Sequence, residues 1–152
     1  MILLTGATGR VGKAAATELL SKGVPFRAFV RDADKFAHTG DGVEMVVGDF
    51  TDPESVARAV KGVTRALIVM GNHPEQAELE QGFATVAAEA GMAHLVKVSS
   101  MEAAPDATAA LPKNHFETEQ TIAELDLDWT FLRPNYYMQN MLMYAASVSR
   151  AS

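Results

Sequence analysis

Residues 5–12 read Thr5-Gly6-Ala7-Thr8-Gly9-Arg10-Val11-Gly12, and this glycine-rich turn decides the fold. The apolar run before it, Ile2–Thr5, is typical of a strand buried on both faces, and good helix formers follow it over Lys13–Lys22. Glycines in such a turn allow a tight bend, a close backbone approach to a phosphate, and packing of helix on strand. The helix N-terminus offers N–H donors and a positive dipole end to an anion. We therefore predict a dinucleotide pyrophosphate site at Gly6–Val11; the alternative is a purely structural turn.

Strands and helices alternate along the rest of the chain. The predicted strands are Pro25–Val30, Glu44–Val47, Arg65–Val69, His94–Ser99 and Asp128–Arg133. The predicted helices are Asp32–Phe36, Pro53–Val60 with Asp52 as its cap, Pro74–Ala90, Asn114–Leu125 and Tyr136–Val148, and Met101–Pro112 is predicted to be an irregular loop. This alternation predicts an α/β fold of the Rossmann type, a doubly wound parallel sheet with helices on both faces. Nothing marks a linker, so residues 1–152 are predicted to form one dinucleotide-binding domain.

The composition narrows the classes of function. The chain has 152 residues, enough to bury one core, and its net charge of -6 disfavours a nucleic-acid partner. No apolar run approaches the ~20 residues that cross a bilayer, and residues 1–5 lack the features of a signal peptide, so we expect a cytoplasmic protein with no membrane partner. Cysteine is absent, which excludes a thiolate nucleophile. No metal site is predicted either, because no metal-ligand spacing relates the four histidines, His38, His73, His94 and His115.

The choice between NADP(H) and NAD(H) depends on the end of the second strand. A carboxylate there would bind the ribose hydroxyls and select NAD. Here Arg31 comes first and Asp32 follows, while Arg10 stands in the glycine-rich turn. Guanidinium groups bind a 2′-phosphate through charge-assisted hydrogen bonds, and Lys35 would add a third cation. NADP(H) is therefore the preferred cofactor, whereas Asp32 keeps NAD(H) open and both charges could also be solvated surface groups.

Two further strand ends supply candidate cofactor-binding residues. Asp49 and Phe50 close the third strand, where the carboxylate can accept from an adenine amino group and the ring can pack on the base. For Asp49, a capping role in the loop before the next helix is an equal alternative. Met70, Gly71 and Asn72 end the fourth strand at the carboxyl edge of the sheet, where ligands of open α/β sheets bind.

With these motifs in place, the chain resembles the NmrA-like group of atypical short-chain dehydrogenases/reductases, which bind NAD(P)H. Within that group it is similar to the quinone oxidoreductase and azoreductase-like members. The matching segments cover nearly the whole chain in order: TGATGRVG at 5–12, VRD at 30–32, VVGDFTDPESVARAVKGV at 46–63, HLVKVSS at 94–100 and NHFETEQTIAELDLDWTFLRPNYYMQN at 114–140. The last segment is the most specific of these.

The resemblance implies roles for individual residues. Gly6–Val11 would hold the pyrophosphate and Arg31 the adenosine phosphate. Further along the cofactor path would lie Met70, Gly71, Asn72 and Ser99, and the nicotinamide would be closed over by Asn135 and Tyr136. The function implied is transfer of hydride from NADPH to a quinone or similar small electrophile.

One departure from the family pattern bears on catalysis. Typical short-chain dehydrogenases use a Tyr-x-x-x-Lys pair, but here the tyrosine position holds Leu111 and the lysine position holds His115. Leucine cannot donate a proton. Quinones accept hydride with less acid assistance, so His115 would orient the cofactor or protonate the product, with Tyr136 as a weaker catalytic candidate. The alternatives are a structural histidine and, for the whole chain, a non-catalytic dinucleotide sensor of the NmrA type.

The C-terminal region raises a question of assembly. Relatives of this kind continue past the Leu-Arg-Pro segment into a smaller lobe that covers the substrate, so this lobe is expected to be missing here. The last strand then becomes a sheet edge, with an exposed apolar group made of Tyr136, Tyr137, Met138, Met141 and Met143. Exposed edges and apolar patches favour association, and we therefore expect a homo-oligomer. The alternative is that the C-terminal helix packs back on the sheet as part of the core.

Overall fold

The computed structural model describes residues 1–141 and contains the alternating pattern that the sequence predicts. Its strands are β1 (Ile2–Thr5), β2 (Phe26–Val30), β3 (Val43–Val47), β4 (Arg65–Ile68), β5 (His94–Val98) and β6 (Asp128–Leu132). Its α-helices are α1 (Arg10–Ser21), α2 (Pro53–Val60), α3 (Gln76–Glu89) and α4 (Ala110–Ala123), with short 3-10 helices at Ala33–Lys35 and Met138–Asn140.

The six strands form one parallel sheet in the order β3-β2-β1-β4-β5-β6. The chain builds outward from β1 to β3, then crosses back through α2 to place β4 on the other side of β1. This is the strand order of a Rossmann fold, and it confirms the predicted fold class. The direction of winding reverses between β1 and β4, so the carboxyl ends of these two strands mark the expected ligand site.

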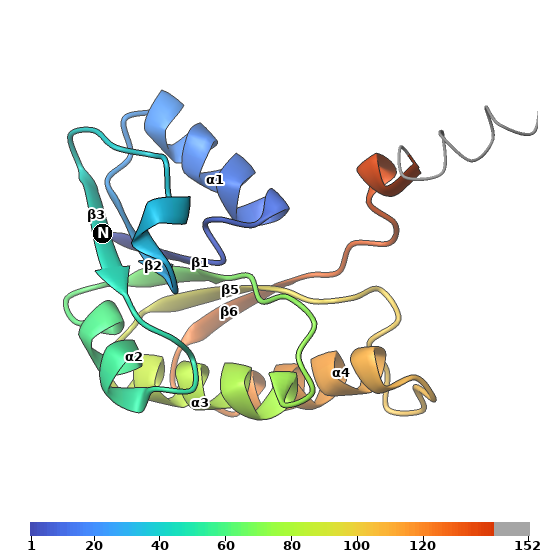
Figure 1. Ribbon diagram of the computed structural model, residues 1–152. Coiled ribbons are helices and arrows are strands. Elements are labelled where there is room, and N and C mark those ends of the chain that lie inside the picture. The colour runs from blue at the N-terminus through green and yellow to red at the C-terminus, as the bar shows by residue number, and fades with distance from the viewer. Residues whose placement is uncertain (142–152) are drawn as a thin grey trace, which may run out of the picture.

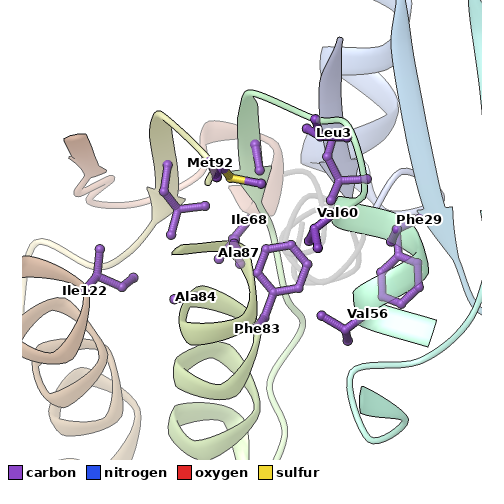
Figure 2. Close-up of a cluster of buried hydrophobic side chains, with 14 residues drawn as sticks. Leu3, Phe29, Val56, Val60, Ile68, Phe83, Ala84, Ala87, Met92 and Ile122 are labelled. Atoms are coloured by element: carbon purple, nitrogen blue, oxygen red, sulfur yellow. The ribbon is translucent and has the colours of Figure 1, made fainter. Parts of the chain in front are cut away.

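The helices lie on both faces of the sheet. In Figure 1, α1 covers one face and α2, α3 and α4 cover the other. The α1 side buries a smaller core that includes Leu4, Ala16 and Phe26. The opposite side buries a larger core around Leu3 and Phe83, to which α2, α3 and α4 all contribute (Figure 2). Neighbouring residues of β1 thus point to opposite faces and are both fully buried, as expected for a central parallel strand.

The structure corrects three of the predicted boundaries. Helix α1 begins at Arg10, so the end of the glycine-rich turn already forms its first helical turn. Helix α4 begins at Ala110 and includes Pro112, which the sequence placed in an irregular loop. Proline is tolerated there because the first amides of a helix have no intrahelical acceptor. Residues 136 and 137 are not helical, and residues 142–148 of the predicted C-terminal helix lie outside the described residues.

Two glycines of the turn have geometric reasons to be glycine. Gly6 has a φ of +60°, and a Cβ there would lie 2.4 Å from the carbonyl oxygen of Val69. Gly12 lies inside α1, where a Cβ would lie 2.2 Å from the carbonyl oxygen of Gly6. The absence of these side chains lets β1, the turn and α1 pack closely at the end of the sheet.

Candidate functional site

A buried threonine ties β1 to β4 where the winding reverses. The Thr5 hydroxyl accepts a hydrogen bond from the Val69 amide at 2.8 Å and lies 3.1 Å from the carbonyl oxygen of Val69. These contacts continue the pairing of the two strands by one residue beyond β4. They hold the glycine-rich turn and the Met70–Asn72 segment side by side at the carboxyl edge.

A cleft of about 300 Å³ opens at this edge. It is bounded by the glycine-rich turn and by the ends of β2, β3 and β4. Eight of the predicted cofactor-binding residues line it: Gly6, Thr8, Arg31, Asp49, Phe50, Met70, Gly71 and Asn72. Residues from four separate strand ends therefore meet where the sequence predicts a dinucleotide.

The glycine-rich turn fits an anionic group. Gly9 precedes α1, and no side chain caps the helix N-terminus. The first amides of the helix are therefore available as donors beside the positive end of its dipole. The Arg10 guanidinium donates a 2.7 Å hydrogen bond to Oδ1 of Asn140, so the segment after β6 reaches the mouth of the turn. Gly9, Arg10 and Val11 do not line the cleft itself, and neither does Ala7, which is buried.

At the end of β2, Arg31 and Asp32 have different surroundings. Arg31 lines the cleft. The Asp32 carboxylate instead accepts from the Asp34 amide at 3.0 Å and pairs with Lys35 at 3.1 Å, and these contacts lower its pKa. In this arrangement Asp32 caps a 3-10 helix, and Lys35 neutralises it rather than joining Arg31 at the cleft. The cation faces the cleft and the carboxylate has other partners.

Asp49 and Phe50 have structural contacts as well as a place in the cleft wall. Oδ1 of Asp49 accepts from both the amide and the hydroxyl of Thr51 at 2.9 Å, which lowers the pKa of this carboxyl. This is the loop role that the sequence left open, and contact with an adenine stays a prediction. The Phe50 ring lies 5.8 Å from Phe29 and 5.1 Å from Phe83 between centroids, so it is also part of the core.

A second pocket of about 270 Å³ adjoins the cleft. The two share Asn72 and His73 as lining residues, and Leu111 and Asn114 of α4 form the far wall of the second pocket. Leu111, in the position where the family pattern expects tyrosine, is thus a wall residue that is 37% exposed. This pocket presents a mostly apolar surface.

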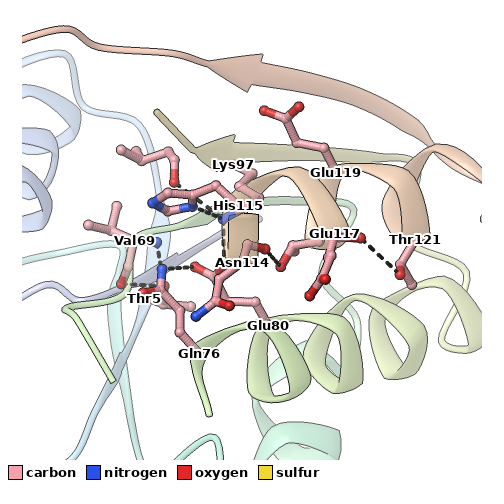
Figure 3. A network of polar contacts seen from close by, with 12 residues as sticks. Thr5, Val69, Gln76, Glu80, Lys97, Asn114, His115, Glu117, Glu119 and Thr121 are labelled. Carbon is pink, nitrogen blue, oxygen red and sulfur yellow. Dashed lines mark hydrogen bonds and ion pairs between the residues drawn. The ribbon is translucent and has the colours of Figure 1, made fainter. Parts of the chain in front are cut away.

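His115 belongs to a buried polar network below this pocket. The Lys97 ammonium lies 2.5 Å from Oε2 of Glu80 and 3.1 Å from Nδ1 of His115. Lys97 and Glu80 are completely buried, and His115 is 8% exposed. Gln76 extends the network, with its amide nitrogen 3.5 Å from Oε1 of Glu80. Figure 3 shows the side chains converging from β5, α3 and α4.

The environment of His115 favours the neutral ring. Burial and the nearby Lys97 ammonium lower its pKa from 6.5 to about 4, although Glu119 opposes the shift. The charged form loses hydration and meets a like charge, and both effects disfavour it. At neutral pH His115 is therefore uncharged. Burial also raises the pKa of Glu80, against the attraction of Lys97.

This shift predicts an acid-sensitive stability. Because the folded-state pKa of His115 is about 4 and its ordinary value is 6.5, folding favours the neutral ring. The resulting stabilisation is fully present above pH 6.5 and is lost as the pH falls towards 4. We expect it to contribute about 2 kcal/mol to the free energy of unfolding.

Urea denaturation at pH 7.0, 5.5 and 4.5 measures this contribution. The matched variant is His115→Asn, whose amide keeps an acceptor for Lys97 but does not titrate. Wild type is expected to lose about 2 kcal/mol more than the variant across this range. Parallel pH dependences for the two proteins would show that His115 is not held neutral by the fold.

The remaining predicted residues lie at the end of β6 and β5. The Arg133 guanidinium binds both carboxylate oxygens of buried Glu119, with Nε 3.0 Å from Oε1. This pair joins the end of β6 to α4. Asn135 and Tyr136 follow on the surface, and Tyr136 is 50% exposed. Ser99 is buried after β5, and its hydroxyl oxygen has no hydrogen-bond partner among the described residues. None of these three residues lines the cleft.

Sequence reasoning missed Lys97, Glu80 and Gln76. A signal was present, because Lys97 is a single charge inside an otherwise apolar strand, and a buried ammonium requires an acidic partner. Its partner stands 17 residues earlier in the chain, among several equally plausible carboxylates of α3. Only the packing of α3 against β5 identifies Glu80.

Two features are absent from residues 1–141. No group of three or more histidine and acidic side chains could hold a metal ion there. In the same residues, no helix has the length and apolar character to cross a membrane.

Comparison with known proteins agrees with the fold. Among curated proteins, the chain is 34% identical over 149 residues to the NAD(P)H azoreductase of Xenophilus azovorans, covering 97% of this chain and 52% of that protein. It is 30% identical over 149 residues to quinone oxidoreductase 2 of Escherichia coli K12, covering 95% of this chain and 52% of that protein. The chain thus spans about half the length of these relatives.

A solved structure and a family model complete the comparison. The structure of Citrobacter sp. triphenylmethane reductase complexed with NADP(H) superposes with a TM-score of 0.85 at 29% identity, over 99% of this chain and 55% of that one. The family model described as NAD(P)H-binding matches residues 6–144. With the strand order and the cleft already established, the chain belongs to this NAD(P)H-binding family.

Proposed function

We propose that this chain is the dinucleotide-binding domain of a reductase that uses NADPH to reduce a quinone or a similar small electrophile. The observation that carries the cofactor part is the cleft at the reversal of winding, which Arg31 lines and beside which the uncapped N-terminus of α1 would supply donors for phosphates. The carboxylate of Asp32 is the group that would bind free ribose hydroxyls. Because it is paired with Lys35 instead, the structure supports NADPH over NADH as the proposed cofactor. The reductases among the relatives support the chemistry.

Different residues along the cleft would bind different parts of the cofactor. The turn at Gly6–Val11 would bind the pyrophosphate, Arg31 the 2′-phosphate, and Asp49 with Phe50 the adenine. Met70–Asn72 and Ser99 would line the path to the nicotinamide, with Asn135 and Tyr136 beside it. When bound, the reduced nicotinamide supplies a hydride, and a quinone that takes up this hydride and one proton from water leaves as a hydroquinone. The apolar pocket at Leu111 and Asn114 suits a flat, weakly polar acceptor.

Titration of the chain with NADPH and NADH by calorimetry tests this proposal, followed by NADPH oxidation with a simple benzoquinone. Tighter binding of NADPH together with turnover would support it. Binding without turnover would favour the second candidate, a dinucleotide sensor of the NmrA type, or a reductase that needs a further substrate lobe. One observation favours that candidate: Leu111 offers no acid where the family pattern has tyrosine. Failure to bind either dinucleotide would contradict both.

Arg31 is expected to decide the preference for NADPH. Replacing it with glutamine should weaken NADPH binding by about tenfold to a hundredfold, the range for a hydrogen bond between charged groups, and change NADH binding by less than about twofold. Calorimetry with both cofactors measures the difference. Arg58→Gln is the control, since Arg58 is equally a surface arginine, lies on α2 and does not line the cleft. Equal losses for NADPH and NADH would show that Arg31 does not recognise the 2′-phosphate.

We also propose that two copies of the chain associate through the edge at β6. This edge strand exposes Trp129 and Leu132, and the segment after it exposes Tyr136, Met138 and Met141, the last two at 70% and 55%. Tyr137 is 37% exposed, and Met143 lies outside the described residues. Sizing chromatography with light scattering at about 100 µM should give the mass of a dimer, as expected for an apolar patch next to a strand edge. A monomer at that concentration would refute it.

We further propose that the protein acts on a small-molecule substrate in the cytoplasm and has no nucleic-acid partner.

A further inference from the structure

Lys97 has three acceptors around its ammonium group. They are Oε2 of Glu80 at 2.5 Å, Nδ1 of His115 at 3.1 Å and the carbonyl oxygen of Val98 at 3.4 Å. An ammonium carries three N–H donors and no lone pair. It can therefore donate to the imidazole but cannot accept from it. With Lys97 charged, Nδ1 of His115 must be the unprotonated nitrogen.

The proton of the neutral ring then stands on Nε2. A histidine tautomer is set by the hydrogen bond that the other ring nitrogen makes, and here that bond comes from a buried ammonium. The described residues provide no hydrogen-bond acceptor for Nε2, so this N–H donor is not used within the described fold.

The charges around His115 come from three elements. Lys97 of β5 is adjacent, Glu80 of α3 neutralises Lys97, and Glu119 lies on α4 one turn after His115. Glu119 is itself neutralised by Arg133 at the end of β6. The nearest charge to the imidazole is thus a cation, which opposes formation of an imidazolium and leaves a neutral donor.

His115 is also close to the second pocket. Leu111 stands one turn earlier on the same face of α4, Asn114 is its neighbour, and both line that pocket. The pocket adjoins the cofactor cleft through Asn72 and His73. His115 does not itself line the pocket, but it is the only histidine of α4 and lies one residue after Asn114 and one turn after Leu111, which do.

We propose that Lys97 is a positioning residue, which locks His115 as a neutral Nε2–H donor to the oxygen of the electron acceptor. This inference rests on the proposed reductase function and assigns within it a role to the Lys97–Glu80 pair. It places His115 among electrophilic neutral imidazoles, which stabilise a developing oxyanion by a hydrogen bond and keep their own proton.

The proton balance follows from that role. As the acceptor gains a hydride and its two electrons, one oxygen becomes an anion that Nε2–H can stabilise. The proton that completes the hydroquinone comes from water, because His115 carries no ionisable proton at neutral pH. Such a site works without the tyrosine that Leu111 replaces. Turnover should accordingly lack a titration near the ordinary histidine pKa of 6.5.

Nitrogen-15 NMR of the histidine rings tests the lock without cofactor or turnover. In the wild-type chain His115 should carry its proton on Nε2 and should not titrate until about pH 4. In the double variant Lys97→Met with Glu80→Gln, which removes the ion pair as a unit, both tautomers should appear. The pKa of His115 should then rise by about one unit, the effect of removing an adjacent like charge. Lys113→Met is the control, because it removes a lysine from the exposed face of the same helix and should leave His115 unchanged.

Kinetics then separate this inference from the proposed function. The double variant should reduce quinone about tenfold more slowly, with its NADPH dissociation constant unchanged, because only the donor is affected. An Nδ1–H tautomer in the wild-type chain would overturn the inference, as would an unchanged tautomer and pKa in the double variant. Either result can occur while NADPH binding and turnover persist, in which case the reductase function stands. Failure of the wild-type chain to bind NADPH would instead overturn the function, and with it the role given to Lys97.

Discussion

Replacement of Gly12 by alanine is expected to lower the free energy of unfolding by about 3 kcal/mol, the cost of overpacking a site that cannot relax. The added Cβ would lie 2.2 Å from the carbonyl oxygen and 2.5 Å from the carbonyl carbon of Gly6. Both atoms are backbone, and Gly6 is itself fixed by its φ of +60° and by its contact with Val69. No side-chain rotation can relieve the clash. The turn must therefore move away from α1, which also displaces the amides proposed to bind phosphate.

The matched control is Gly82→Ala, the same substitution in α3. Nothing lies within 4 Å of a Cβ at Gly82, so alanine should there stabilise the helix by about 0.5–1 kcal/mol. Urea denaturation of the two variants beside wild type measures both effects. We expect the same change from glycine to alanine to destabilise the chain at position 12 and to stabilise it at position 82. A Gly12→Ala protein as stable as wild type would mean that α1 does not pack against the turn as closely as described.

Much of the fold could be predicted from local patterns. All six strands and the main helices occur where apolar runs, glycines and caps indicate them, and the Asp52 cap with Pro53 marks the start of α2 in the sequence as in the structure. The errors lie at helix starts, where local signals conflict. Pro112 looks like a helix breaker in sequence but lies in the first turn of α4, where no amide hydrogen bond is lost.

The site was predictable where it depends on backbone and strand ends. Parallel strands bring their carboxyl ends to one edge, so Gly6, Arg31 and Met70 could be expected to meet from their positions alone. The partners of charged side chains could not be obtained in that way. In sequence Asp32 kept NAD(H) open as a cofactor, and only the fold shows that it caps a 3-10 helix and binds Lys35.

His115 illustrates the same limit more strongly. Its sequence position suggested a catalytic role by resemblance, but the protonation state decides what such a residue can do. That state depends on Lys97 and Glu80, which come from β5 and α3. Burial and charge are properties of the packed structure, so a histidine that looks like an acid in the sequence becomes a neutral donor in the fold.

We also expect a large loss of stability when the buried Lys97–Glu80 ion pair next to His115 is broken. Replacing Lys97 with methionine is expected to cost about 3–5 kcal/mol of unfolding free energy at pH 7, because the Glu80 carboxylate is left buried without its counter-ion. The double variant with Glu80→Gln should recover most of this loss, since no uncompensated charge remains. The two substitutions should therefore be strongly non-additive.

The loss of stability in Lys97→Met should depend on pH, whereas the loss from a simple packing defect should not. Burial already raises the pKa of Glu80, and loss of Lys97 removes the attraction that opposes the rise. Protonation of Glu80 at lower pH removes the buried charge, so the deficit of Lys97→Met relative to wild type should shrink as the pH falls below 7. Urea denaturation at pH 7 and pH 5.5 measures it, with Lys113→Met on the surface of α4 expected to match wild type. A deficit that is independent of pH and is not relieved by Glu80→Gln would mean that Lys97 acts through the volume of its side chain rather than through its charge.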